Sequence, residues 1–297
     1  MSTFKNFINS YKRSNKLTQL IYINSIVFVL INTLEIISKL FNLSTISLLL
    51  NLALPSSISL LLEMPWTLIS YMFLHEELFH YFFNMLSLYW FGRLFSMYFT
   101  EKQLIGLYIT GGLSGALFYI ISFLYIPYFQ NLTEHNILLG ASAAVMSIIV
   151  AIATAAPNMN LQMMFIGGMK LKYIALIAVA TSFFSITSSN GGGQIAHLGG
   201  ALAGYIFVVS LQNKIDITHW INWIFDLIVG RFKSPKLKVK PVNHPKGKKM
   251  TDEEFNMHKA ERIKSIDNIL DKIKTSGYDS LTTEEKKRLF EQGNRTT

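Results

Sequence analysis

Hydrophobic residues gather in long runs between residues 17 and 212 of the chain, whereas residues 231–297 are rich in charge. A helix that spans a lipid bilayer needs about 20 mostly apolar residues in succession. Six segments meet this requirement and are predicted to be membrane-spanning helices: roughly 17–36, 79–99, 103–126, 138–156, 171–188 and 194–212. The predicted fold class is therefore all-α, a polytopic membrane protein with a six-helix bundle.

A further apolar run at 43–62 is interrupted by Pro55, Ser56 and Ser57. An irregular backbone exposed to lipid would leave its N–H and C=O groups without hydrogen-bond partners. We therefore expect this run to be an outer loop that dips into the membrane interface, rather than a seventh span.

Charged residues predict the orientation of the bundle. Lys5, Lys12, Arg13 and Lys16 precede the first predicted helix with no acidic residue among them, and Lys and Arg recur in every second loop. Loops rich in these residues stay on the cytoplasmic side of a membrane. Both termini are therefore predicted to be cytoplasmic, and the many Ile, Asn and Lys residues favour a bacterial inner membrane as the location.

Four further segments flank the helical domain at 17–212. A cytoplasmic segment at 1–16 precedes it, and a short amphipathic helix at 213–230 is predicted to follow it and to lie in the interface. Residues 231–249 form a basic linker with three prolines and no acidic residue, which we expect to be extended and to bind anionic lipid. Residues 250–297 are predicted to form a cytoplasmic helical hairpin.

Capping signals define the two helices of this hairpin. Thr251 with Glu254, and Thr282 with Glu285, have the spacing of a capping box, in which a hydroxyl and a carboxylate satisfy the first backbone N–H groups of a helix. Gly277 is expected to end the first helix.

Composition excludes several classes of function. The chain is 51% hydrophobic and 15% charged, below the roughly 25% charge of soluble domains. Its net charge of +9 is explained first by membrane orientation, so no nucleic-acid partner is expected. The absence of cysteine excludes disulfides, thiolate catalysis and cysteine-based metal sites.

Polar residues inside membrane helices mark candidate functional sites, because hydrocarbon makes them costly. His80 and Asn84, Ser142, and His197 each lie near the start of the second, fourth or sixth predicted helix. These three helices all run inward from the outer face in the predicted topology. The four side chains are therefore expected at a similar depth.

Their chemistry is that of acyl transfer. A serine hydroxyl is a poor nucleophile until a base takes its proton, and His197 is a plausible base for Ser142. Backbone N–H groups at the helix start, together with His80 and Asn84, are candidate donors to an oxyanion. Because no carboxylate is found near this depth in the three helices, a Ser–His dyad is predicted, without an acid that orients the base.

Small residues are predicted to bring the dyad together. Gly200 and Gly204 share a helix face with His197, and small residues four apart let two membrane helices approach closely. Gly140 lies just before Ser142, at the start of the fourth predicted helix.

This combination of motifs resembles the rhomboid family of intramembrane serine proteases, of the bacterial type with a cytoplasmic C-terminal tail. The resemblance rests on His75, His80 and Asn84, then Gly-Ala-Ser142, then Ala-His197 with Gly200 and Gly204, in this order, and it covers 17–212. It implies cleavage of transmembrane protein substrates without a cofactor. It also implies Ser142 as nucleophile, His197 as base, His80 and Asn84 as oxyanion donors, and a structural role for His75.

Two positions depart from the family pattern. Ala143 stands where the family usually has glycine, and Met146 where an aromatic residue often stacks on the histidine. Neither change removes a reacting group, but both alter packing next to the site.

Other functions remain open at this point. A non-catalytic relative would act as a membrane chaperone or adaptor that binds transmembrane helices, although such proteins usually lose the serine or the histidine. A transporter is disfavoured because no inverted repeat and no acidic residue at mid-membrane depth is found. No metal is expected, because the intramembrane histidines lack carboxylate partners at ligand spacing.

Overall fold

The computed structural model describes every residue of the chain except 1, 43–47, 133–135, 164–166, 233–251 and 294–297. The chain divides into two compact units, Met1–Lys233 and Ser234–Thr297, which are described separately.

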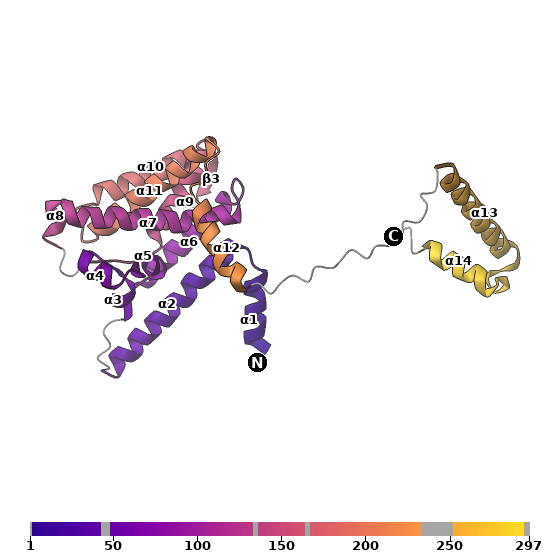
Figure 1. Cartoon of the computed structure of the whole chain (residues 1–297), viewed down its shortest axis with the longest axis horizontal. Coiled ribbons are helices and arrows are strands. Elements are labelled where there is room, and N and C mark those ends of the chain that lie inside the picture. Colours follow the sequence, from indigo (N-terminus) through magenta and orange to yellow (C-terminus); the bar gives the residue numbers. More distant parts are fainter. Residues whose placement is uncertain (1, 43–47, 133–135, 164–166, 233–251, 294–297) are drawn as a thin grey trace. The chain divides into compact units, whose positions relative to one another are not determined.

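The first unit is a bundle in which all six predicted helices are present (Figure 1). Their bounds are α2 Lys16–Leu40, α6 Leu78–Phe95, α7 Glu101–Tyr125, α9 Ser142–Ala155, α10 Leu171–Phe184 and α11 Gly191–Gln212. Among the described helices, α2, α7 and α11 are long and apolar enough to cross a membrane, and α9 and α10 are shorter apolar helices. The prediction of a helical, polytopic membrane protein is confirmed.

Helix α9 lies at the centre of the bundle. It packs against α6, α7, α10 and α11, and nine of its fourteen residues are buried. Helix α11 also packs along α7, while α2 covers α6 and α7 from the other side. Residues near the start of α9 are therefore surrounded by the neighbouring helices rather than by lipid.

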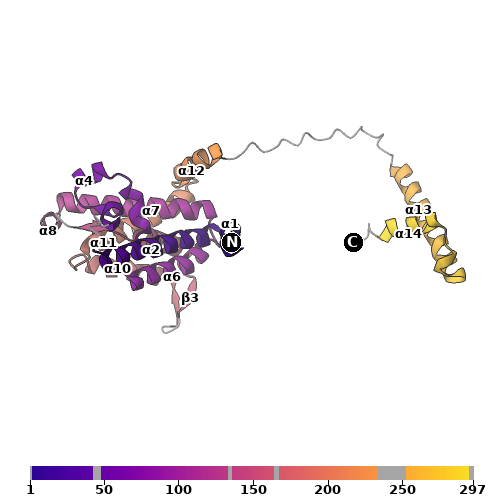
Figure 2. The ribbon, with the colours of Figure 1, turned by 90° about the horizontal axis from the view of Figure 1, so that it is seen from below.

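Shorter elements connect and cap these helices. They are α1 Ser2–Arg13, α3 Leu48–Leu52, β1 Leu54–Pro55, α4 Ile58–Glu63, α5 Thr67–Ser70, the 3-10 helix η1 Tyr71–Phe73, α8 Pro127–Gln130, β2 Ile137–Leu138, β3 Asn160–Met163, β4 Gly167–Lys170 and α12 His219–Phe232. Strands β1 and β2 pair antiparallel with Leu54 opposite Leu138, and β3 pairs antiparallel with β4. The β3–β4 pair projects from the bundle (Figure 2).

The apolar run at 43–62 contains no spanning helix among its described residues, but it is more ordered than a loop. It folds into α3, β1 and α4, and residues 43–47 lie outside the described part. Pro55 ends β1, where Ser56 donates its backbone N–H to the Asn136 carbonyl at 3.1 Å. Hydrogen bonds to the neighbouring strand therefore satisfy the backbone that the proline interrupts.

The fourth predicted helix begins later than expected. The pattern predicted a helix from residue 138, but Leu138 belongs to β2 and α9 begins at Ser142. Gly140 separates the two with φ of 115°, a left-handed conformation that glycine adopts without steric cost. Ser142 is therefore the first residue of its helix.

Two further differences concern the predicted N-terminal segment at 1–16 and the predicted interfacial helix at 213–230. The 1–16 segment contains the helix α1, which was not predicted. The helix predicted at 213–230 begins at His219, because Asp216 accepts hydrogen bonds from the backbone N–H and hydroxyl of Thr218 and forms a turn first.

The second unit is a helical hairpin, as predicted for 250–297. Helix α13 Asp252–Ser276 is followed by the 3-10 helix η3 Tyr278–Ser280 and by α14 Thr283–Gly293. Gly277 ends α13 with φ of 79°, and Lys272 on α13 forms a salt bridge with Glu285 on α14 at 3.0 Å. The linker from residue 233 onward and the capping residue Thr251 lie outside the described residues.

The second capping box is confirmed and generates a prediction about pH. Thr282 donates its backbone N–H to Glu285 at 2.7 Å, and this bond, with help from Lys272, lowers the pKa of Glu285 from 4.5 to about 2. Because the folded-state pKa is lowered, the contribution of the cap is present above pH 4.5 and is lost as the pH falls through about 2. In ¹⁵N NMR spectra of the full chain in detergent micelles, the Thr282 amide signal should shift with a midpoint near pH 2.

The matched control is Glu285→Gln, which should remove this titration of the Thr282 amide. A wild-type midpoint close to 4.5 would show that the carboxylate is not held by the cap in solution.

Candidate active site

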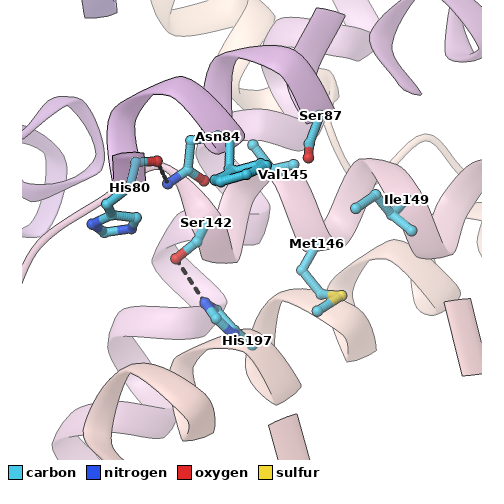
Figure 3. Close-up of a pocket in the computed structure, with 9 residues that line it drawn as sticks. His80, Asn84, Ser87, Ser142, Val145, Met146, Ile149 and His197 are labelled. Carbon is cyan, nitrogen blue, oxygen red and sulfur yellow. Dashed lines mark hydrogen bonds between the residues drawn. The ribbon is translucent and has the colours of Figure 1, made fainter. Parts of the chain in front are cut away.

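A pocket opens where the N-terminal parts of α6, α9 and α11 meet. It has a volume of about 180 Å³ (Figure 3). Its lining consists of His80, Phe83, Asn84, Ser87, Ser142, Val145, Met146, Ile149 and His197. The four residues expected at one depth therefore line a single cavity.

Ser142 and His197 are joined directly. His197 Nε2 lies 2.7 Å from Ser142 Oγ, a short hydrogen bond between α11 and α9 (Figure 3). When Nε2 is unprotonated it accepts the serine proton, which is the arrangement of a nucleophile with its base. Ser142 is also the first residue of α9, where backbone N–H groups have no partner within the helix.

The other ring nitrogen of His197 has a partner that the sequence analysis missed. Ser182, on α10, places its Oγ 3.1 Å from His197 Nδ1, and its side chain is 3% exposed. The sequence pattern indicated only whether the helices of the other site residues carry a carboxylate. Ser182 lies on a different helix and carries a hydroxyl, so no motif pointed to it.

Asn84 and His80 line the pocket beside Ser142. Asn84 Nδ2 donates to the His80 backbone carbonyl at 3.0 Å, and an amide nitrogen carries a second hydrogen that can also be donated. The His80 ring packs against the Gly140 turn, where a Cβ on Gly140 would lie 2.9 Å from His80 Cε1.

His75 lies behind the pocket rather than in its wall. It is 1% exposed, and its Nε2 accepts the backbone N–H of Ala141 at 3.4 Å. Gly140 in turn donates its N–H to the Tyr71 carbonyl at 2.9 Å. The turn that precedes Ser142 is therefore held by two residues of the segment that leads into α6.

Helices α9 and α11 approach closely at two glycines of α11. A Cβ on Gly200 would overlap the Ala143 carbonyl oxygen, and a Cβ on Gly204 would overlap the Ser147 carbonyl oxygen. These backbone contacts are the close approach that the small-residue spacing predicted.

Ala143, one of the two departures from the family pattern, has space for its methyl group. The side chain is buried, and a Cβ added to Gly115 of α7 would lie 2.6 Å from the Ala143 Cβ. The missing side chain at Gly115 therefore accommodates the extra methyl. Met146, the other departure, lines the pocket together with His197.

Metal ligands do not cluster in the part of the chain that the structure describes. Within these residues no group of three or more His, Cys, Asp or Glu side chains is placed to hold an ion.

The glycine contact between α9 and α11 gives a stability prediction. Gly200→Ala forces the two backbones apart, and overpacking of this kind costs about 1–3 kcal/mol. Thermal unfolding of the protein in detergent should show a clearly lowered midpoint. Gly168→Ala on β4 serves as control, because its added Cβ would meet the nearest atom, on Gln162, at an ordinary 3.4 Å.

Equal unfolding midpoints for Gly200→Ala and Gly168→Ala would mean that the two helices do not pack this closely in solution.

Two family models and a curated relative match parts of the chain. The Rhomboid domain family matches residues 62–214, which is more than half of the chain, and a family of unknown function (DUF6576) matches residues 249–294. The chain is also similar to the RHOMBOID-like protein 12, mitochondrial, of Arabidopsis thaliana, with 30% identity over 149 residues. That match covers 47% of this chain and 44% of the plant protein, so the chain spans less than half the length of this relative.

Proposed function

The chain belongs to the rhomboid family, and from this premise we propose that it is an intramembrane serine endopeptidase that cleaves transmembrane segments of other membrane proteins. The observation that carries the proposal is the 2.7 Å hydrogen bond between Ser142 Oγ and His197 Nε2 in a pocket of an integral membrane protein.

The reaction proceeds by acyl transfer. His197 Nε2 takes the Ser142 proton while Oγ attacks the carbonyl carbon of the scissile peptide bond, which forms a tetrahedral intermediate. The C–N bond then breaks, and the amine leaves with the proton that His197 returns. A water molecule, deprotonated by the same nitrogen, attacks the acyl-enzyme ester and releases the carboxyl product with a restored serine.

The oxyanion of the intermediate needs donors that are in place before charge develops. Ser142 is the first residue of α9, so the backbone N–H groups of this first turn, which have no partner within the helix, are candidate donors. The second hydrogen of Asn84 Nδ2 and the ring of His80 supply further donors from the facing wall of the pocket.

In the topology predicted from the charged loops, this chemistry occurs near the outer ends of the substrate helices. With six spans and both termini in the cytoplasm, α6, α9 and α11 begin at the outer face, and the pocket lies beneath that face. In the same topology the basic linker at 231–249 is expected on the cytoplasmic side, where anionic lipid would attract it.

The activated serine is tested by labelling the detergent-purified protein with a fluorophosphonate. Wild-type protein should be labelled, whereas Ser142→Ala and His197→Ala should reduce labelling to background, because the phosphonylated oxygen and its base are removed. Thr154→Ala, on the same helix but outside the pocket, is the matched control and should label as wild type.

A folded wild-type protein that resists labelling would contradict the protease proposal. That outcome would favour a non-catalytic protein that binds transmembrane helices.

The oxyanion role of Asn84 predicts a loss of rate without a loss of fold. Asn84→Ala should lower kcat for a transmembrane reporter substrate about 100-fold, because removal of one preorganised donor costs roughly 10²–10³ in kcat. Cleavage is followed by gel densitometry, and the unfolding midpoint is measured on the same samples. An unchanged kcat would remove Asn84 from the oxyanion site.

A further inference from the structure

The base of the site is bonded on both sides of its ring. His197 Nε2 lies 2.7 Å from Ser142 Oγ, and His197 Nδ1 lies 3.1 Å from Ser182 Oγ. The three residues come from α9, α11 and α10, so the contact extends the site onto a helix that contributes no residue to the pocket wall.

The protonation of the two ring nitrogens is linked. A neutral imidazole carries one hydrogen, and Nε2 accepts the serine proton when that hydrogen is on Nδ1. A hydroxyl can accept or donate, so Ser182 Oγ accepts the hydrogen when it is on Nδ1 and donates to Nδ1 when the hydrogen is on Nε2. In the first of these tautomers Nε2 faces Ser142 as a base, and once the ring has taken up the serine proton Ser182 can only accept from Nδ1–H, so the bond then holds the imidazolium.

The position of Ser182 on α10 shows that its hydroxyl is turned inward. The buried residues of this helix are Leu171, Ala175 and Ser182. They are four and then seven positions apart, which places all three on one face of the helix. The neighbours Thr181 and Phe183 are exposed. A polar side chain on the buried face of a membrane helix is costly unless it is hydrogen-bonded, and His197 supplies that bond.

We propose that Ser182 is a positioning residue for the base, and that its neutral hydroxyl takes the place of the carboxylate in a Ser–His–Asp triad. This inference rests on the proposed protease function. During attack the ring becomes an imidazolium, and the bond from Nδ1–H to Ser182 becomes charge-assisted and stronger. A carboxylate at this position would have to be desolvated inside the bundle, which is expensive.

The kinetic test compares Ser182→Ala with Ser182→Thr, which restores the hydroxyl, and with Thr181→Ala on the exposed face of the same helix. Ser182→Ala should lower kcat about tenfold, since a charge-assisted hydrogen bond is lost. KM should be unchanged, and the acid limb of the pH–rate profile should move to lower pH because the protonated ring is less stabilised. Ser182→Thr should recover most of the rate, and Thr181→Ala should match wild type.

A spectroscopic test is independent of catalysis. In protein labelled with ¹⁵N-histidine, the ring nitrogen shifts report which nitrogen carries the hydrogen, and His197 is assigned among the seven histidines by its loss in His197→Ala. The hydrogen should be on Nδ1 in the wild type and in Ser182→Thr. Ser182→Ala should move part of the population to Nε2–H.

The outcomes separate this inference from the protease proposal. An active wild type in which Ser182→Ala changes neither the pH–rate profile nor the tautomer would overturn the role of Ser182 and leave the protease standing. An inactive wild type would overturn the protease. The tautomer measurement on Ser182→Ala would then still decide whether Ser182 holds the ring. A tautomer unchanged from wild type would refute the role of Ser182.

Discussion

The hydrogen bond between Ser142 and His197 depends on how closely α9 and α11 lie. Both side chains are short relative to the usual separation of packed helices, which is 8–10 Å between axes. At Gly200 and Gly204 the backbone of α11 contacts carbonyl oxygens of α9, and no side chain keeps the two helices apart. The glycines therefore set the geometry of a bond in which neither of them takes part.

A second constraint is the cost of polar groups in an apolar bundle, and several of the buried polar side chains are hydrogen-bonded to one another or to the backbone. Asn24 is fully buried on α2 and bonds to the Tyr108 hydroxyl at 3.3 Å, and Tyr108 donates to the Met72 carbonyl at 2.9 Å. The Tyr71 hydroxyl donates to the Gly112 carbonyl at 2.6 Å. These bonds tie the segment before α6, which carries His75, to the long helix α7.

The sequence pattern was sufficient to predict the six helices, because runs of apolar residues leave few alternatives in a membrane. The pattern also predicted that Ser142, His197, His80 and Asn84 lie at a similar depth in the membrane. In the structure all four line one pocket. The start of α9 was predicted too early, since the apolar run continues through Leu138 and nothing local shows that this residue pairs with Leu54. Ser182 was missed because its contact with His197 depends on the packing of α10 against α11, which periodicity does not reveal.

The length of α10 has a consequence for the lipid around it. Its 14 residues rise about 21 Å, whereas the hydrocarbon core of a typical bilayer is about 30 Å thick. Several of its side chains, among them Leu176, Ile177 and Phe183, are exposed on the surface of the bundle. Hydrophobic mismatch of this kind is accommodated by thinning of the adjacent bilayer, by snorkelling of flanking residues or by oligomerisation. Where the bilayer thins, headgroups and water come closer to the bundle beside α10, the helix whose Ser182 contacts His197.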